Sequence, residues 1–220
     1  MCYNKSSSIN AFTIGLLSSL LLYKNKFTER TENHKVFQQL ALFFAFVSLM
    51  QIYDAIFWSS LQDNDGKNNT NYVFTKLAMI TNHLQPIVLA YLINQYIELN
   101  DITKIVLAIY TFIALVYSIE AYQRIDYTIV TKESAPALHW EWNTLENTTF
   151  RSLHMYGLFL TVLSLISLQL PYPISYVMLF INLATFLFSK YTYKILDIGR
   201  MWCHIAAYIP LLLLIFEMSY

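Results

Sequence analysis

The chain has 220 residues, of which 56% are hydrophobic and only 13% are charged, and its formal net charge is zero. A soluble domain usually has about a quarter of its residues charged, so this composition and a mean hydropathy of +0.43 indicate lipid as the solvent. The neutral charge gives no basic surface for nucleic acid, and two cysteines, Cys2 and Cys203, cannot build a disulfide framework. We expect one domain, residues 1–220.

Seven stretches are apolar enough to form helices across a bilayer, whose hydrocarbon core of about 30 Å needs roughly 20 residues. No cleavage site follows the first stretch, so we expect a retained helix there rather than a signal peptide. The sequence therefore predicts an all-α, polytopic membrane protein with a bundle of seven transmembrane helices. The expected spans are residues 9–23, 36–60, 72–96, 105–119, 152–170, 174–189 and 201–218.

The connection after the first span sets the expected orientation. It carries the densest basic cluster of any loop: Lys24, Lys26, Arg30 and Lys35. Because cytoplasmic loops are enriched in Lys and Arg, this cluster places the N-terminus outside and, with seven spans, the C-terminus in the cytoplasm.

Two features fall on the predicted outer side. Glycosylation sequons begin at Asn68 and Asn147, which we predict as acceptor sites. The longer connection, residues 122–150, contains Trp140 and Trp142. Indole rings favour the headgroup region of a bilayer, so we expect these two tryptophans to act as interfacial anchors.

Asp54 is an ionisable residue inside the second span, where a charge costs about 2.5–3.5 kcal/mol near the bilayer centre. Gln51, Asp54 and Trp58 lie along one face of the predicted helix. Such a carboxylate is tolerated when it faces the bundle interior and meets a partner, and Arg200 and His204 of the last span are the expected partners. A purely structural ion pair between Asp54 and Arg200 is the alternative to a functional site.

The third span adds Asn82, His83 and Gln85 before Pro86, which removes a backbone donor and is expected to kink the helix, and the fifth span adds His154. A polar pocket open to the non-cytoplasmic side would collect these groups. As a first hypothesis, this pocket binds or moves a small ligand, a lipid headgroup or an ion. The expected ligand-binding residues are Gln51, Asp54, Trp58, Asn82, Gln85, Arg200 and Trp202.

A second hypothesis is a metal-dependent lipid hydrolase, in which Asp54, His83 and His204 bind zinc as a cofactor. The chain is similar in outline to the seven-helix ceramidase-like hydrolases. Those enzymes pair histidines one turn apart in the last helix, whereas here Tyr208 follows His204 at that spacing. A third hypothesis is a membrane scaffold without catalysis, in which the polar residues only hold helices together.

Other chemistries are excluded by missing residues. The last span has no lysine for a retinal Schiff base, and no glycine-rich phosphate loop, G-x-S-x-G or H-E-x-x-H motif occurs. The sequence therefore assigns no catalytic residue, and the expected partners are membrane lipid and an unidentified small ligand or ion.

Three short motifs remain: Gln51-x-x-Asp54-x-x-x-Trp58, "NHLQP" from Asn82 to Pro86, and "GRMWC" from Gly199 to Cys203. In these motifs the chain resembles a group of small, uncharacterised multi-spanning proteins found mainly in large DNA viruses of algae and protists. The resemblance implies a shared membrane fold, in a host or virion membrane, and brings no established activity. It directs attention to Gln51, Asp54, Trp58, Gln85, Pro86, Trp202 and Cys203.

Overall fold

The structure is a computed structural model, and most of its described residues lie in helices. It describes residues 4–24, 33–61, 67–130, 138–143, 145, 147–193 and 198–218. The backbone alone is described at residues 130, 186, 189, 190, 192, 193, 198–201 and 216–218.

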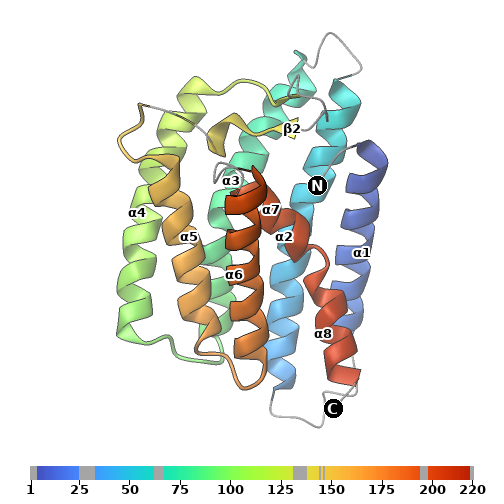
Figure 1. The fold of residues 1–220 in the computed structure, drawn as a ribbon, viewed down its shortest axis with the longest axis vertical. Helices are drawn as coiled ribbons and strands as arrows, with labels where there is room; N and C mark the ends of the chain where they lie inside the picture. Colours follow the sequence, from blue (N-terminus) through green and yellow to red (C-terminus); the bar gives the residue numbers. More distant parts are fainter. Residues whose placement is uncertain are drawn as a thin grey trace.

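The long helices run up and down along one common direction (Figure 1). In chain order they are α1 (Lys5–Lys24), α2 (His34–Ser60), α3 (Asn69–Asn94), α4 (Asp101–Arg124), α5 (Ser152–Ser167), α6 (Ile174–Tyr193), α7 (Ile198–Ala206) and α8 (Ile209–Met218). Three of them, α1, α2 and α4, are long and apolar enough to cross a membrane. Shorter apolar helices cover residues 152–167, 174–185 and 202–215.

Several helix ends follow from local chemistry. The side chain of Asn68 accepts a hydrogen bond from the backbone N–H of Asn71 and begins α3, and Asn100 does the same for Thr103 in α4. Pro171 and Pro173 follow α5 and prevent its continuation as a helix.

The seventh expected span, residues 201–218, holds two helices rather than one. α7 ends at Ala206, and α8 begins at Ile209 after the turn at Ala207 and Tyr208. Pro210 explains the break, because it has no N–H to donate to the carbonyl of Ala206 and its ring fits best in the first turn of a helix, where it lies in α8.

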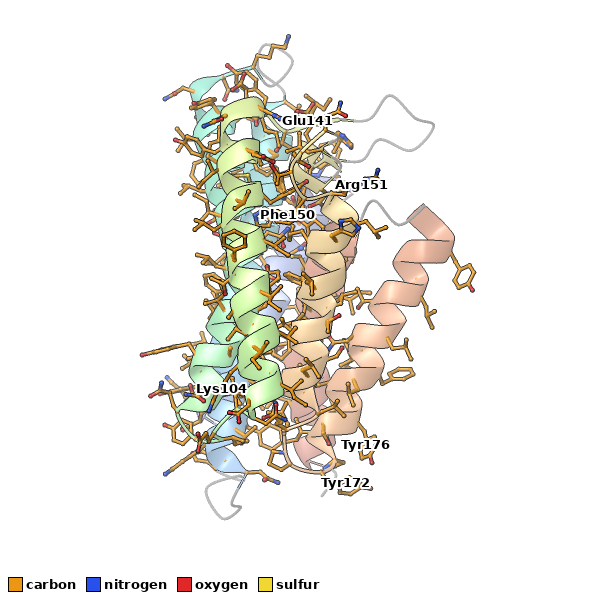
Figure 2. The ribbon with its side chains drawn as sticks, turned by 90° about the vertical axis from the view of Figure 1, so that its left-hand side faces the viewer. Lys104, Glu141, Phe150, Arg151, Tyr172 and Tyr176 are labelled. Atoms are coloured by element: carbon orange, nitrogen blue, oxygen red, sulfur yellow. The ribbon has the colours of Figure 1, made fainter. Side chains whose placement is uncertain are left out.

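α2 is the central helix. It packs against α1, α3, α7 and α8, and 61% of its most apolar window is buried, against 22% for α4. α4 packs against α3 and α5 at the periphery. Figure 2 shows α6 leaning away from α5 toward its C-terminal end, and Phe188 and Tyr191 near that end are exposed.

The segment between α4 and α5 closes one end of the bundle. Strands β1 (Ile129–Val130) and β2 (Leu138–His139) pair antiparallel, and the short 3-10 helix η3 (Glu141–Asn143) follows. Glu141 and Arg151 lie at this end, which we call the upper end, and Lys104, Tyr172 and Tyr176 lie at the other (Figure 2). α1 begins at the upper end and α8 ends at the lower end (Figure 1).

The expectation that Trp140 and Trp142 are interfacial anchors is wrong. Their side chains are 1% and 0% exposed, because the segment 138–143 turns both indoles into the bundle rather than outward. Strand β2 of this segment pairs with β1, and Thr128, just before β1, is held to α3: its backbone N–H donates to the side chain of Asn71 (2.9 Å), and its carbonyl accepts from that side chain (2.9 Å).

Gly15 marks the closest helix approach in α1. A Cβ at this position would lie 2.8 Å from the carbonyl oxygen of Ala207, in the break between α7 and α8, and would overlap the hydroxyl of Ser48 on α2. The missing side chain therefore lets α1 pack against both α2 and the broken helix.

We predict that Gly15→Ala destabilises the protein by about 1–3 kcal/mol, because the added methyl group overpacks this contact. Gly157→Ala is the matched control, since a Cβ there meets no atom within 4 Å, and better helix propensity should make it neutral or stabilising by up to about 1 kcal/mol. Thermal unfolding of both variants in detergent is the measurement. Equal stability of the two variants would contradict the close contact.

Candidate functional site

Gln51 and Asp54 lie buried in α2, both with side chains 0% exposed. Oδ1 of Asp54 accepts a hydrogen bond from Nε1 of Trp140 at 3.1 Å. Trp140 in turn stacks on Trp142, with ring centroids 5.0 Å apart and planes at 21°. The α2 carboxylate is therefore joined to the segment that closes the upper end.

The motif "NHLQP" and the motif "GRMWC" meet directly. Nε1 of Trp202 on α7 donates to Oε1 of Gln85 on α3 at 2.9 Å, and Nε2 of Gln85 donates to the sulfur of Cys203 at 3.2 Å. All three side chains are fully buried. Both side-chain partners of Gln85 therefore come from α7.

From Cys203 the hydrogen bonds continue toward the upper end. The thiol donates to Oδ1 of Asn82 at 3.7 Å, and Nδ2 of Asn82 donates to the hydroxyl of Tyr156 on α5 at 2.8 Å. The Tyr156 hydroxyl then donates to Oδ1 of Asn143. We call the buried group formed by Asp54, Asn82, Gln85, Trp140, Trp142, Asn143, Tyr156, Trp202 and Cys203 the polar centre.

His83 lies beside the polar centre and is 3% exposed. Its ring packs edge-on against Tyr117 and Tyr156, at centroid distances of 5.7 and 6.1 Å. Its Nδ1 is 2.6 Å from the hydroxyl of Ser118 on α4. The carbonyl of His83 accepts from the hydroxyl of Tyr110 at 2.7 Å. The preceding carbonyl, that of Asn82, has no helical donor because Pro86, four residues later, lacks an N–H.

Within the described part of the chain, the buried nitrogen atoms around this centre without a hydrogen-bond partner include Nε2 of His83, Nε1 of Trp142 and Nδ2 of Asn143. A buried polar group without a partner costs about 1–3 kcal/mol, and most such groups in folded proteins are satisfied by protein or by ordered water.

A groove between α3 and α4 adjoins the polar centre at His83. Its volume is about 470 Å³, within the range of sites for small molecules. Met79, His83 and Ala114, each less than 5% exposed, form its floor, and exposed apolar side chains such as Leu84 and Leu115 form its rim. The groove opens sideways between two helices, whereas the sequence predicts a pocket open to one end of the bundle.

Other expected site residues lie elsewhere. Trp58 is half-buried and packs against the hydrophobic core. The side chain of Arg200 lies outside the described residues, so its pairing with Asp54 stays a prediction. His154 is exposed on α5, and its ring therefore does not join the interior group.

The expected metal ligands are Asp54, His83 and His204. His204 is half-buried, with its ring edge-on to Tyr208 at 5.6 Å, while the ring of His83 meets the hydroxyl of Ser118 on α4. Within the part of the chain that the structure describes, no three His, Cys, Asp or Glu side chains form a group that could hold a metal ion. The geometry thus gives the zinc hypothesis no support.

The predicted glycosylation residues both lie near the upper end. The side chain of Asn68 caps α3, and its Nδ2 donates to the carbonyl of Ser60 at 3.0 Å. Asn147 is exposed and adopts a positive φ of 57°, while its carbonyl accepts from Arg124 at 3.0 Å.

Sequence reasoning missed Tyr117, Ser118, Asn143 and Tyr156. Tyrosine and serine are frequent in this chain, so their presence in a span carries no signal. The stretch "HWEWN", in which Asn143 follows two tryptophans, was the sequence feature that could have indicated this site. Buried indoles usually need a polar partner for each ring nitrogen.

Comparison of the chain with protein-family models, with curated proteins and with solved structures finds no match.

We predict that Trp202→Phe and Gln85→Leu each destabilise the protein by about 1–3 kcal/mol or more, because each leaves a buried polar group without its partner. The double variant should lose less than the sum of the two, with a coupling free energy of about 0.5–3 kcal/mol. Chemical denaturation of the four proteins in detergent measures this. Strict additivity would show that the bond contributes nothing.

The stacked tryptophans provide a second, matched comparison. Trp140→Phe removes the donor to Asp54, whereas Trp142→Phe removes an N–H without a partner, and both remove the same volume. We therefore expect Trp140→Phe to destabilise the protein by about 1–3 kcal/mol more than Trp142→Phe. Denaturation midpoints of the two variants decide this, and equal midpoints would exclude a stabilising role for the Asp54 bond.

Proposed function

We propose that the chain is a seven-span membrane protein that binds the hydrocarbon part of a membrane lipid in the groove between α3 and α4. α1 to α6 would each cross the bilayer once, and α7 and α8 together would make the seventh crossing. The lower end, which Lys24 and Lys35 flank, would face the cytoplasm, in agreement with the enrichment of basic residues in cytoplasmic loops.

The groove is the observation that carries the proposal. Its twelve lining residues are mostly aliphatic. The polar pair in its wall, His83 Nδ1 and Ser118, is satisfied by its own hydrogen bond, so the wall offers little to a polar ligand. Burial of hydrocarbon in a preformed apolar groove is favourable at roughly 0.8 kcal/mol per CH₂ group.

The surroundings of the groove support lateral entry. On α4, Ile105, Ile109 and Phe112 are 60%, 48% and 61% exposed, which is the pattern of a helix that faces lipid rather than water. A lipid chain would therefore reach the groove from within the bilayer, without crossing the polar ends of the bundle.

The polar centre would lie at the inner wall of this site. It contains Asp54, Gln85, and Trp202 with Cys203, which belong to the three motifs in which the chain resembles the multi-spanning proteins of large DNA viruses. We extend the proposal to that group, and with it to a host or virion membrane as the location. Asp54 and Trp140 would hold the closing segment in place over the bound lipid.

The test is photolabelling in vesicles that contain phosphatidylcholine with a diazirine on one acyl chain. We expect crosslinks to concentrate on residues 79–87 and 111–119 and to be scarce on the exposed face of α6. Thr111→Trp, which fills the groove from an exposed position, should reduce this labelling by about tenfold, the equivalent of roughly 1.4 kcal/mol of binding.

Ile109→Trp is the control, because it adds the same indole to an exposed position of α4 outside the groove lining. It should leave the labelling unchanged. Uniform labelling of α4 and α6, unaffected by either variant, would indicate ordinary contact with bulk lipid and would favour the scaffold hypothesis.

A further inference from the structure

His83 and Ser118 form a polar pair in the wall of the groove between α3 and α4. Both residues line the groove, and Nδ1 of His83 lies 2.6 Å from the hydroxyl oxygen of Ser118. His83 is 3% exposed and Ser118 is half-buried. The pair is therefore a fixed polar point in a groove whose other walls are mostly aliphatic.

The hydroxyl oxygen of Ser118 can take one more hydrogen bond in either neutral tautomer of His83. If Nδ1 carries no proton, the serine donates to it, and the serine oxygen keeps its lone pairs for an incoming donor. If Nδ1 carries the proton, the serine oxygen accepts it and keeps one lone pair and its own proton. Among the described residues, Ser118 has no hydrogen-bond partner other than His83.

A hydroxyl group is the ligand group that fits both tautomers. It can donate to the oxygen of Ser118 in either tautomer, and it can also accept the serine proton when Nδ1 of His83 is protonated. A carbonyl or ether oxygen can only accept, so it fits one tautomer alone. The pair therefore favours an alcohol over an ester, a ketone or an ether.

The groove favours an uncharged ligand. None of the residues that line it is Lys, Arg, Asp or Glu, and a charged group would have to leave water without a partner of opposite charge. Lys76, one turn above Ile80 on α3, is already engaged, because its Nζ donates to the carbonyl of Tyr122 at 2.6 Å and lies 3.9 Å from the carboxylate of Asp126.

The polarity of the lining also gives the ligand a direction. α4 runs from the lower end of the bundle to the upper end (Figure 2), and Ser118, Tyr122 and Gln123 line the upper part of the groove. Below them the α4 wall continues through Leu115 to Thr111, two helical turns or about 10 Å from Ser118. A hydroxyl group at Ser118 thus leaves the lower, more apolar part of the groove for hydrocarbon.

We propose that the lipid bound in the groove is a neutral lipid alcohol, whose hydroxyl group hydrogen-bonds to Ser118 and whose hydrocarbon extends toward the lower end. This proposal rests on the proposed function, because the hydrocarbon of the same molecule occupies the groove. His83 is a positioning residue, since its ring nitrogen holds the hydroxyl of Ser118 in place. The molecule would lie as a lipid of the non-cytoplasmic leaflet does, with its polar end toward the upper surface.

The experiment is competition against the diazirine-labelled phosphatidylcholine, with the full-length protein in detergent. Three competitors have chains of the same length and differ at the end: hexadecan-1-ol, hexadecane and palmitate. We expect hexadecan-1-ol to compete at about tenfold lower concentration than hexadecane, since one good hydrogen bond is worth about that factor. Palmitate, which is charged, should compete no better than hexadecane.

Variants of the two hydroxyl residues in the lining locate the effect. Ser118→Ala should abolish the advantage of hexadecan-1-ol and leave competition by hexadecane unchanged, whereas Ser118→Thr, which restores a hydroxyl group, should keep the advantage. Thr111→Val is the matched control and should also keep it, because the hydroxyl of Thr111 is exposed and donates to the carbonyl of Leu107 in its own helix at 2.8 Å.

Cholesterol and 1,2-dioctanoylglycerol, used as further competitors, distinguish a sterol from a glyceride as the source of the hydroxyl group. Competition by either one should weaken about tenfold in Ser118→Ala, and competition that is unchanged there would contradict the role of Ser118.

The results separate this inference from the proposed function. If hexadecane or palmitate competes as well as the alcohol while the groove of the unaltered protein is still labelled, the alcohol inference is wrong and the proposed function stands. This comparison uses no variant, so it decides even where Ser118→Ala fails to fold. An advantage that survives in Ser118→Ala, or is lost in Thr111→Val, would also overturn the inference. Absence of groove labelling by the diazirine lipid itself would instead refute the proposed function.

Discussion

The hydrogen bond from Trp202 to Gln85 fixes the orientation of the Gln85 amide in the polar centre, because an indole N–H cannot accept. The amide nitrogen then donates to Cys203, and the hydrogen bonds continue through Asn82 and Tyr156 to Asn143. Hydrogen bonds aligned in one direction polarise each other and strengthen in a low-dielectric interior. This series of hydrogen bonds joins α7, α3, α5 and the segment between α4 and α5. It therefore also fixes how these elements pack against one another.

In a bundle of mostly apolar helices, such a series of hydrogen bonds contributes to the specificity of packing. Leucine and phenylalanine pack against one another in many registers, and within a bilayer the contact between two helices gains little from burial of apolar surface. Specific polar pairs and close approaches then decide which faces meet. Gly15 supplies the close approach, against Ser48 and the carbonyl of Ala207, and Gln85 supplies the specific pair. Gly15 contacts the break between α7 and α8, and Gln85 contacts α7. Both contacts therefore hold the two short helices in place.

The sequence predicts the helical class and the burial of Gln51, Asp54, Asn82, His83 and Gln85, because a polar residue inside an apolar span has few other places to go. It does not predict the partners. Trp140 donates to Asp54 from a connection 86 residues away in sequence, which no local period encodes, and the expected pairing of Asp54 with Arg200 stays a prediction. The break before Ile209 was signalled by Pro210, and the groove was not signalled at all. A groove is a property of two helix surfaces, and its lining residues are indistinguishable in sequence from ordinary lipid-facing ones.

The stacked indoles of Trp140 and Trp142 also make the centre optically addressable. The chain has four tryptophans, and three of them are fully buried within this one group. Two rings held 5.0 Å apart at 21° couple their electronic transitions, so the near-ultraviolet circular dichroism of the protein is sensitive to the geometry of this stacked pair. The molecule thus contains its own chromophore pair, Trp140 and Trp142, beside the carboxyl group of Asp54. A rearrangement of this pair would change the circular dichroism and fluorescence of the protein without an added label.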